Sequence, residues 1–222
     1  MQRKAILTKD GSYTISVPEM KVAYHSVYGA IQESMHVFIE AGLQPLSRQP
    51  GKQIRIFEMG LGTGLNALLS LIEAEKSGMN IYYATVELFP LLENEMLELN
   101  YCEQLNRSDL QPLFEKLHSS RWNQVHTISK HFSFKKVSAN FLAFTTSETF
   151  ELCYYDAFAP AAQPELWTKG VFEKIYSMMD PDGVVVTYCA KGDVRRAMQG
   201  AGFTVEKIPG PRGKREMLRA AK

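Results

Sequence analysis

The stretch Ile54-Arg55-Ile56-Phe57-Glu58-Met59-Gly60-Leu61-Gly62-Thr63-Gly64 decides the fold of this chain, because it joins an apolar strand to a turn of alternating glycines. A helix is predicted directly after it, over residues 66–76, and a second strand over residues 81–87. Strand, turn, helix and strand in this order form the unit from which parallel sheets are built. Glycines spaced so closely let the backbone pass directly beneath a ligand, because no Cβ stands in the way.

The alternation of strands and helices continues toward the C-terminus. Further strands are expected over residues 134–137, 150–155 and 184–189, and helices over 91–99, 110–117, 167–179 and 194–201. Asp180-Pro181-Asp182-Gly183 is expected to end the helix before it, and Asp193 to cap the helix after it. Residues 203–208 and 215–220 are predicted to pair. The pattern indicates an α/β fold: a mostly parallel sheet with helices on both faces and a C-terminal antiparallel strand pair.

An N-terminal appendage precedes this unit. Residues 4–17 alternate around Asp10-Gly11 and predict a β-hairpin. A helix follows with Ile31, Met35, Phe38 and Ile39 on one face, and Gly42 is its expected stop signal. Residues 46–52 are expected to form a surface linker. We therefore divide the chain into a hairpin-and-helix appendage or lid over residues 1–50 and a main domain over residues 51–222.

The composition excludes several classes of protein. The chain has 222 residues, of which 45% are hydrophobic and 22% charged, so a disordered or fibrous chain is excluded. Its net charge is +1, so any contact with nucleic acid must come from a local basic patch. No apolar run is long enough to span a bilayer, and the N-terminus does not resemble a signal peptide. Three scattered cysteines fit a reduced protein, so we expect a cytoplasmic location without a membrane partner. The five histidines lack the spacing of a zinc site, so no metal is expected.

Two acidic residues accompany the glycine turn. Glu58 closes the first strand, where its carboxylate can receive a cationic amine. Glu87 closes the second strand, where it can take both hydroxyls of a ribose. The turn lacks the lysine of a phosphate-binding loop, and Leu65 stands where a dinucleotide fingerprint has its last glycine. S-adenosylmethionine, which carries a ribose and a cationic amino-acid tail, fits this set; a tight turn without a ligand is the alternative.

An acidic residue followed by alternating glycines resembles the first motif of class I S-adenosylmethionine-dependent methyltransferases. The resemblance implies a Rossmann-like fold and cofactor contacts through Glu58, Gly60, Gly62, Gly64 and Glu87. Members of this class usually place an aspartate after the third strand, near the adenine amino group. Asn140 stands at the corresponding position of this chain, where its amide oxygen is the candidate for that contact.

The strand over residues 150–155 ends in Asp156-Ala157-Phe158-Ala159-Pro160. In methyltransferases that act on amino groups, the loop at this place holds the target nitrogen. A sulfonium methyl is already reactive, so the protein must mainly align the nucleophile with it. Asp156 can orient the amine and take its proton. Phe158 can pack on a flat base, and Pro160 stiffens the loop; a turn or cap residue is the alternative for Asp156.

Longer blocks are similar to the methyltransferase domain of the bifunctional tRNA 5-methylaminomethyl-2-thiouridine biosynthesis protein. They are residues 24–26 with 32–34 and 36–38, residues 58–66 (which add Asn66 to the cofactor set), residues 156–160 with 164–168, and residues 213–218. The resemblance implies methyl transfer from S-adenosylmethionine to the amine of 5-aminomethyl-(2-thio)uridine at the tRNA wobble position, with S-adenosylhomocysteine as product. Two-domain members carry an FAD-dependent oxidase that makes this amine. Because the sequence stops at Lys222, we expect a stand-alone methyltransferase without flavin that depends on a separate enzyme for its substrate.

The resemblance also implies a lid and a surface for tRNA. Tyr24 and Ser26 would lie on an N-terminal lid over the cofactor or over the flipped base, and simple packing is the alternative. The best basic patch for tRNA phosphates is Lys207, Arg212, Lys214 and Arg215, and an ordinary solvated surface is its alternative. Two other functions compete with the tRNA methyltransferase: a methyltransferase of a small-molecule or protein amine, and a non-catalytic subunit that binds the cofactor.

Overall fold

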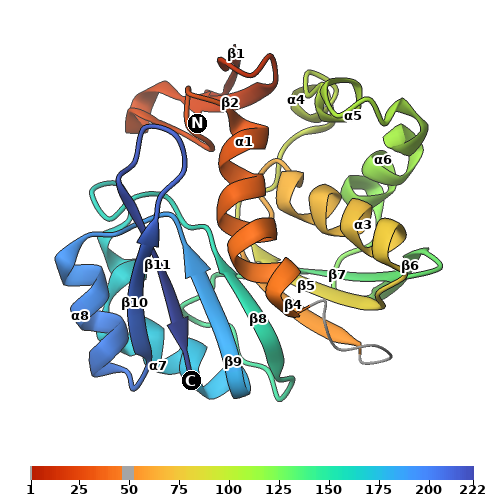
Figure 1. Ribbon diagram of the computed structural model, residues 1–222. Coiled ribbons are helices and arrows are strands. Elements are labelled where there is room, and N and C mark those ends of the chain that lie inside the picture. The colour runs from red at the N-terminus through yellow and green to blue at the C-terminus, as the bar shows by residue number, and fades with distance from the viewer. Residues whose placement is uncertain (1, 47–52) are drawn as a thin grey trace.

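The fold is a layered α/β structure built on one large sheet, as the sequence predicts. The computed structural model describes residues 2–46 and 53–222. Within them, eight strands form the large sheet in the order β10-β11-β9-β8-β4-β5-β7-β6 (Figure 1). The strands in chain order are β4 (Ile54–Met59), β5 (Ile81–Glu87), β6 (Val125–Ser129), β7 (Phe132–Ser138), β8 (Phe150–Tyr155), β9 (Met179–Thr187), β10 (Thr204–Pro209) and β11 (Glu216–Ala221).

The centre of the sheet is parallel and its two margins are antiparallel. β4 pairs in parallel with both β5 and β8, and β7 and β9 extend this parallel block on either side. β11 runs antiparallel to its neighbours β9 and β10, which confirms the predicted C-terminal pair. β6, which the sequence did not reveal, pairs antiparallel with β7. The carboxyl ends of the parallel strands therefore meet at one edge, where ligands of such sheets bind.

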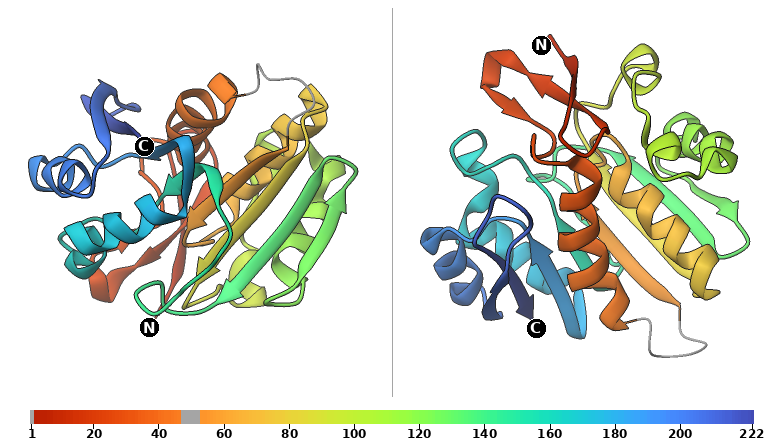
Figure 2. Two further views of the ribbon diagram at one scale, coloured as in Figure 1. Left: turned by 90° about the horizontal axis from the view of Figure 1, so that it is seen from below. Right: turned by 45° about the horizontal axis from the view of Figure 1, so that its top comes forward.

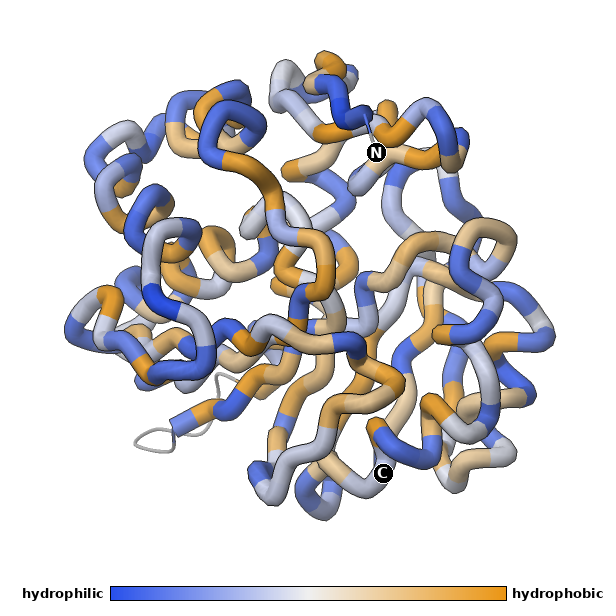
Figure 3. Tube along the Cα trace, turned by 180° about the vertical axis from the view of Figure 1, so that it is seen from behind, coloured by the Kyte–Doolittle hydropathy of each residue, from blue (hydrophilic) through white to orange (hydrophobic). Residues whose placement is uncertain are grey.

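Two hydrophobic cores lie on opposite faces of the sheet (Figures 2 and 3). Alternate residues of β4 point to different cores: Ile54 and Ile56 to one, Phe57 and Met59 to the other. The first core is covered by α3 (Leu65–Ser77), α6 (Gln111–Ser119) and one continuous helical segment made of α1 (Ala30–Ser34), η2 (Met35–Leu43) and α2 (Gln44–Leu46). The second core is covered by α7 (Lys169–Met178) and α8 (Gly192–Gly200).

A small N-terminal sheet lies over the carboxyl ends of the central strands (Figure 1). β1 (Lys4–Leu7) and β2 (Tyr13–Val17) form the predicted hairpin, and β3 (Val22–Ala23) adds a third strand. The predicted boundary between residues 1–50 and 51–222, and most of the predicted linker, lie outside the described residues. The remaining short elements are η1 (Pro18–Met20), α4 (Glu93–Met96), α5 (Tyr101–Gln104), η3 (Ser108–Leu110) and η4 (Pro164–Trp167).

Gly42 does not stop the N-terminal helical segment, contrary to the prediction, because the helix continues to Leu46. Its role is to allow close packing. A Cβ on Gly42 would lie 3.1 Å from Cγ2 of Val186 and 3.4 Å from Leu152 and Tyr154. The missing side chain lets the helix rest directly on β8 and β9.

Three other local predictions were wrong. α7 ends before residues 180–183, as predicted, but the strand that follows does not begin at Val184: β9 already begins at Met179 and includes these residues, with a register shift against β8. Asp193 is not the cap of α8; Lys191 is, and the Asp193 carboxylate accepts a hydrogen bond from Arg196 within the helix. The helix predicted over residues 91–99 is only the single turn of α4.

We expect Gly42→Leu to destabilise the protein by about 1–3 kcal/mol, because the added side chain overpacks a complete core. Urea denaturation followed by circular dichroism measures the change. Gly170→Ala is the matched control: it also lies in a helix, but a Cβ there has no neighbour within 4 Å. That variant should be unchanged or stabilised by up to about 1 kcal/mol. Equal stability of Gly42→Leu and the wild type would contradict the packing role.

Candidate functional site

A cavity of about 380 Å³ opens at the carboxyl ends of β4, β5, β7 and β8, beneath the small N-terminal sheet. Its size is typical of pockets for small organic ligands. Several residues predicted from the sequence line it: Tyr24, Gly60, Gly62, Asn66, Glu87, Asn140, Asp156 and Phe158. The structure therefore brings together residues that lie more than 130 positions apart in the chain.

The glycine turn between β4 and α3 needs glycine for its backbone conformation. Gly60, Gly62 and Gly64 all have positive φ, at 86°, 54° and 75°. It also needs glycine for space: a Cβ on Gly62 would lie 3.0 Å from the Tyr24 ring, and one on Gly64 would lie 2.8 Å from Nε2 of His118. Gly60 and Gly62 therefore present bare backbone to the cavity, whereas Gly64 faces His118 on α6.

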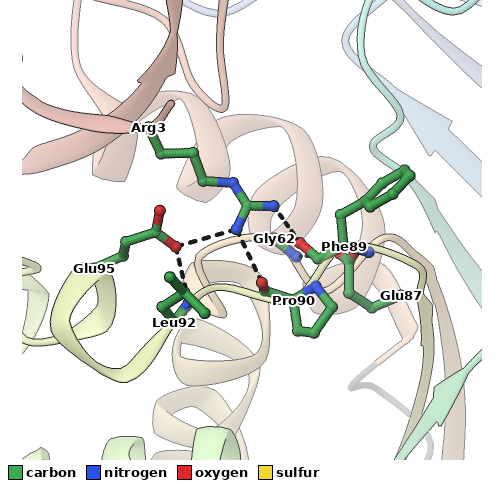
Figure 4. Close-up of polar contacts among 7 residues, drawn as sticks. All are labelled: Arg3, Gly62, Glu87, Phe89, Pro90, Leu92 and Glu95. Atoms are coloured by element: carbon green, nitrogen blue, oxygen red, sulfur yellow. Dashed lines mark hydrogen bonds and ion pairs between the residues drawn. The ribbon is translucent and has the colours of Figure 1, made fainter. Parts of the chain in front are cut away.

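Glu87 is held in place by two backbone amides (Figure 4). Its Oε2 accepts a hydrogen bond of 3.0 Å from the N–H of Gly62, and its Oε1 accepts one of 2.7 Å from the N–H of Phe89. Each carboxylate oxygen keeps a second lone pair for a further donor. A fixed carboxylate beside a bare glycine turn fits a ribose with two free hydroxyls, which is the fit that S-adenosylmethionine requires.

Arg3 is a cavity residue that the sequence did not reveal. Its Nη1 donates to the carbonyl oxygen of Pro90, at 2.9 Å, and to Oε2 of Glu95, at 3.1 Å; its Nη2 donates to the carbonyl oxygen of Phe89 (Figure 4). The side chains of Arg3 and Glu95 are only 9% and 12% exposed. Arg3 therefore fastens the N-terminal sheet to the loop after β5, and that sheet forms the roof of the cavity.

Asn66, in the first turn of α3, joins two carboxylates. Its Nδ2 donates to Oε1 of Glu58 and to Oδ2 of Asp156, each at 2.9 Å. Glu58 is 1% exposed and lies behind Asn66 instead of lining the cavity. Burial raises the pKa of Glu58 well above its usual value, against the effect of the Asn66 hydrogen bond. The predicted contact between Glu58 and a cofactor amine stays a prediction, and Asn66 occupies the nearer position.

Asp156 has an unusual acidity. It is partly exposed where it lines the cavity, and protein surrounds its other sides. Burial is the main cause that raises its pKa to about 7, and the negative charge of Glu33 adds to the effect. The hydrogen bond from Asn66 and the positive charge of Lys214 act in the opposite direction. At neutral pH this carboxyl group can therefore both give and accept a proton.

The loop that follows Asp156 is held from several sides. Tyr188 donates its hydroxyl hydrogen to the carbonyl oxygen of Ala157 at 2.8 Å. The N–H of Phe158 donates to Oε1 of Gln163 at 3.1 Å, and its carbonyl oxygen accepts from Nε1 of Trp167 at 2.8 Å. Through Trp167, the block of residues 164–168 thus contacts the loop that follows Asp156. The structure places Pro160 outside the cavity lining.

Tyr24 and Asn140 also have defined partners. The Tyr24 ring meets the edge of the Phe158 ring at a centroid distance of 4.9 Å, so the roof contacts the loop of the reaction site. The amide oxygen of Asn140, the candidate for the adenine contact, already accepts the N–H of Leu142 at 2.9 Å. This oxygen keeps a second lone pair, and the amide NH₂ group offers donors, so both ends of the amide are candidates for contact with a base. Ser26 does not line the cavity; its N–H donates to Oε2 of Glu33 at 2.7 Å.

The four predicted tRNA-binding residues do not form one solvent-facing patch. Lys207 pairs with Glu216, and Lys214 pairs with Glu33, each with an N–O distance of 2.6 Å. Arg212 and Arg215 are exposed. Of these four residues, only Arg212 and Arg215 have no ion pair with another described residue.

Sequence reasoning missed part of the cavity wall because these residues carry no local signal. They are the roof residues Arg3 and Met20 and the half-exposed apolar residues Leu88, Phe89 and Leu142 of the rim. Residues 2–46 and 53–222 contain no group of three His, Cys, Asp or Glu side chains placed to hold a metal ion. No helix in the same ranges is long and apolar enough to cross a membrane.

Comparison with known proteins finds similarity to methyltransferases. Residues 115–222 match the model of a family described as S-adenosyl-L-methionine-dependent methyltransferase. The chain is also 29% identical, over 96% of its length, to the tRNA 5-methylaminomethyl-2-thiouridine biosynthesis bifunctional protein MnmC of Cupriavidus metallidurans, of which the match covers 33%. The same-named protein of Burkholderia thailandensis is 28% identical over 96% of this chain and 34% of that protein. The chain spans about a third of the length of these curated relatives.

Solved structures share the fold. The crystal structure of MNMC2 from Aquifex aeolicus matches with a TM-score of 0.78 and 24% identity, over 99% of this chain and 70% of that chain. Spermidine synthase from Thermotoga maritima matches with a TM-score of 0.57 and 11% identity, over 99% and 68% of the two chains. These likenesses confirm the predicted Rossmann-like methyltransferase fold. The C-terminal half of the chain is thus similar to the S-adenosyl-L-methionine-dependent methyltransferases, and nearly its whole length is similar to the bifunctional MnmC proteins.

Proposed function

We propose that this protein transfers a methyl group from S-adenosylmethionine to the amine of 5-aminomethyl-(2-thio)uridine at the wobble position of tRNA, and releases S-adenosylhomocysteine. The observation that carries the proposal is the position of Asp156. This carboxyl group, with a pKa of about 7, lies in the same cavity as the glycine turn and Glu87. The names of the curated relatives support tRNA uridine as the substrate.

The cofactor side of the cavity is already organised by the protein. When it is bound, S-adenosylmethionine supplies an electrophilic methyl group on a sulfonium sulfur. Glu87, fixed by the amides of Gly62 and Phe89, would accept the ribose hydroxyls. The side-chain amide of Asn140 would face the adenine ring, and the glycine turn would pass beneath the amino-acid tail. Because these groups are fixed before binding, little ordering is needed at the moment of reaction.

The amine side requires a proton acceptor. An alkylamine with a pKa of ~10.4 is mostly protonated at neutral pH, and freeing its lone pair costs roughly 4–5 kcal/mol. The ionised Asp156 would accept a hydrogen bond from the amine, direct its lone pair toward the methyl group and take its proton. Phe158, whose backbone is held by Gln163 and Trp167, would pack against the pyrimidine. The base must leave its stack to reach this depth.

The supply of substrate and the location follow from the same proposal. The curated relatives are bifunctional and about three times as long as this chain. The aminomethyl group would be made by a second activity, and the methyl transfer itself would need no flavin or metal. A tRNA substrate implies a cytoplasmic location.

The direct test is methylation of tRNA that carries the 5-aminomethyl group. The protein is incubated with this tRNA and S-adenosylmethionine, and the nucleosides are analysed by mass spectrometry after nuclease digestion. We expect the mass of one methyl group to be added to the aminomethyluridine at the wobble position. Methylation of a free amine or a protein instead, or transfer that persists after the tRNA is removed by ribonuclease, would overturn the proposal. Cofactor binding without transfer to any tRNA fraction would favour a non-catalytic subunit.

We expect Gly62→Val to lower the affinity for S-adenosylmethionine by more than about ten-fold, measured by calorimetry. Valine is strained at a φ of 54°, and its Cβ would lie 3.0 Å from the Tyr24 ring. Gly78→Val is the matched control: Gly78 has a φ of 72°, but it lies at the far end of α3, where a Cβ has no neighbour within 4 Å. The control should lose stability and keep its cofactor affinity. Unchanged affinity in Gly62→Val would place the cofactor elsewhere.

We expect kcat/KM for tRNA to rise with pH through about 7, because Asp156 must be ionised to accept the proton and its pKa is raised to that value. Asp156→Asn should remove this dependence and lower kcat by about 10²–10⁴-fold. Asp109→Asn, a change at an exposed aspartate paired with Arg107, is the control and should preserve the profile. An Asp156→Asn variant with the wild-type rate and profile would remove this residue from the mechanism.

We expect the double charge reversal Arg212→Glu/Arg215→Glu to raise KM for tRNA about ten-fold without changing the cofactor affinity. Each lost phosphate contact should also reduce the slope of log K against log salt by about 1. Lys76→Glu, an exposed change at the opposite end of α3 from the glycine turn, is the control and should alter neither value. An unchanged salt slope in the double variant would show that tRNA binds another surface.

A further inference from the structure

Two segments at opposite ends of the chain meet beside the reaction site. Nζ of Lys214, in the loop between β10 and β11, lies 2.6 Å from Oε1 of Glu33 on α1, although 181 residues separate them. The Glu33 side chain is 10% exposed and that of Lys214 is 35% exposed. The loop is docked closely here, because a Cβ on Gly213 would lie 2.7 Å from the Tyr28 ring. Glu33 and Lys214 belong to two separate blocks of family resemblance in the sequence, and these blocks are in contact in the structure.

Both members of this ion pair have a second contact, and that of Lys214 leads toward Asp156. Oε2 of Glu33 accepts the N–H of Ser26 at 2.7 Å, which fixes the carboxylate. Nζ of Lys214 lies 3.9 Å from the centroid of the Tyr188 ring, where a cation is attracted by the ring face. The hydroxyl of the same ring donates to the carbonyl oxygen of Ala157, the residue after Asp156. One aromatic ring therefore connects the ion pair to the loop of the reaction site.

Asp156 is surrounded by charged and titratable groups from several elements. They are Glu33 on α1, Lys214 on the β10–β11 loop, Glu58 on β4 and Tyr188 directly after β9, together with the amide of Asn66 on α3. Glu33 raises the pKa of Asp156 and Lys214 lowers it. His25 of the roof is also near the pair, and burial lowers its pKa to about 4, so it is neutral at the working pH. The two charges of the ion pair therefore act on Asp156 in opposite directions.

We propose that Lys214 and Glu33 are positioning residues for methyl transfer: they hold the Asp156 loop through Tyr188 and set the electrostatic potential at the Asp156 carboxylate. This inference rests on the proposed function, in which Asp156 receives the substrate amine. It replaces a phosphate contact as the role of Lys214, because its ammonium group is already engaged by a carboxylate and an aromatic ring.

Methyl transfer to an amine explains what the Lys214–Glu33 ion pair can contribute. A cation near the amine site disfavours the protonated amine and so increases the fraction with a free lone pair. A lone lysine at this place would instead be drawn to Asp156 and neutralise it. Glu33 prevents this by holding the ammonium group over the Tyr188 ring. The pair thus fixes where the positive charge of Lys214 and the negative charge of Glu33 lie, and leaves Asp156 available to the substrate.

The test compares Lys214→Met, Glu33→Gln and the double variant in the full chain. The acidity of Asp156 is read without tRNA, by ¹³C NMR of labelled aspartate carboxyl groups, and Asp156→Asn assigns the signal. We expect the pKa of Asp156 to rise in Lys214→Met and to fall in Glu33→Gln, each by at least about half a unit, or roughly three-fold in the dissociation constant. The double variant should return close to the wild-type value. The pH profile of kcat/KM for tRNA should move in the same directions.

A purely structural role predicts a different pattern, because loosening the loop would shift both single variants the same way. Shifts in one common direction, or no shift, would overturn the proposal. So would a ten-fold rise in KM for tRNA in Lys214→Met with an unchanged kcat and pH profile, since that result indicates a phosphate contact. Thermal unfolding and cofactor affinity confirm that each variant is folded.

Lys169 and Glu173 on α7 form a matched control pair. Their N–O distance is also 2.6 Å, but both side chains are more than half exposed. Lys169→Met and Glu173→Gln should leave the Asp156 signal and the pH profile unchanged. The two readouts also separate this proposal from the proposed function. Opposite NMR shifts without methylation of any tRNA would support the effect of the ion pair on Asp156 and reject the proposed function. Methylation of tRNA with an unmoved Asp156 signal would support the proposed function and reject the role of the ion pair.

Discussion

The side-chain amide of Asn66 is the contact on which the site depends, because it holds two carboxyl groups at the carboxyl ends of neighbouring parallel strands. One hydrogen goes to Glu58 at the end of β4 and the other to Asp156 directly after β8. Burial is the main cause that raises the pKa of both carboxyl groups, and the negative charge of Asp156 raises that of Glu58 further. Parallel pairing of β4 with β8 brings them together, and α3 delivers the amide from the glycine turn. The fold thus produces an aspartate that exchanges a proton near neutral pH.

The small N-terminal sheet completes the cavity that the large sheet begins. Without it, the glycine turn and Glu87 would lie in an open crevice. Arg3 fastens this roof to the loop after β5 through a largely buried ion pair, and Tyr24 covers the turn and touches Phe158. The roof and the reaction loop therefore contact each other directly. Excluding water in this way strengthens every electrostatic interaction inside the cavity, including the effect of Lys214 on Asp156.

Local sequence predicted the fold class, the parallel core of the sheet, and the glycine turn and Asp156 that line the cavity. Its predictions failed at positions where tertiary packing decided the local structure. Gly42 is a usual helix stop, but here it permits a helix to rest on β8 and β9. The turn-forming residues 180–183 lie within β9, at a register shift where Met179 and Val184 pair with β8 and the residues between them do not. β6 was missed because its alternation is short and its residues are half-exposed.

The sequence by itself determined which residues lie at the ends of the parallel strands. The glycine turn directly follows one apolar strand and a carboxylate ends the next, so each position is fixed by the strand before it. Gly62, Glu87 and Asp156 could therefore be placed in one cavity before any coordinates were known. Only the tertiary structure decided the partners of charged side chains that lie far from this turn. From the sequence, Lys214 was predicted to be a surface lysine, but it forms an ion pair with Glu33, 181 positions away. Arg3 likewise pairs with Glu95, 92 positions away. Such pairs depend on how the terminal segments fold back over the sheet. No local pattern of residues predicts a contact between side chains so far apart in the sequence.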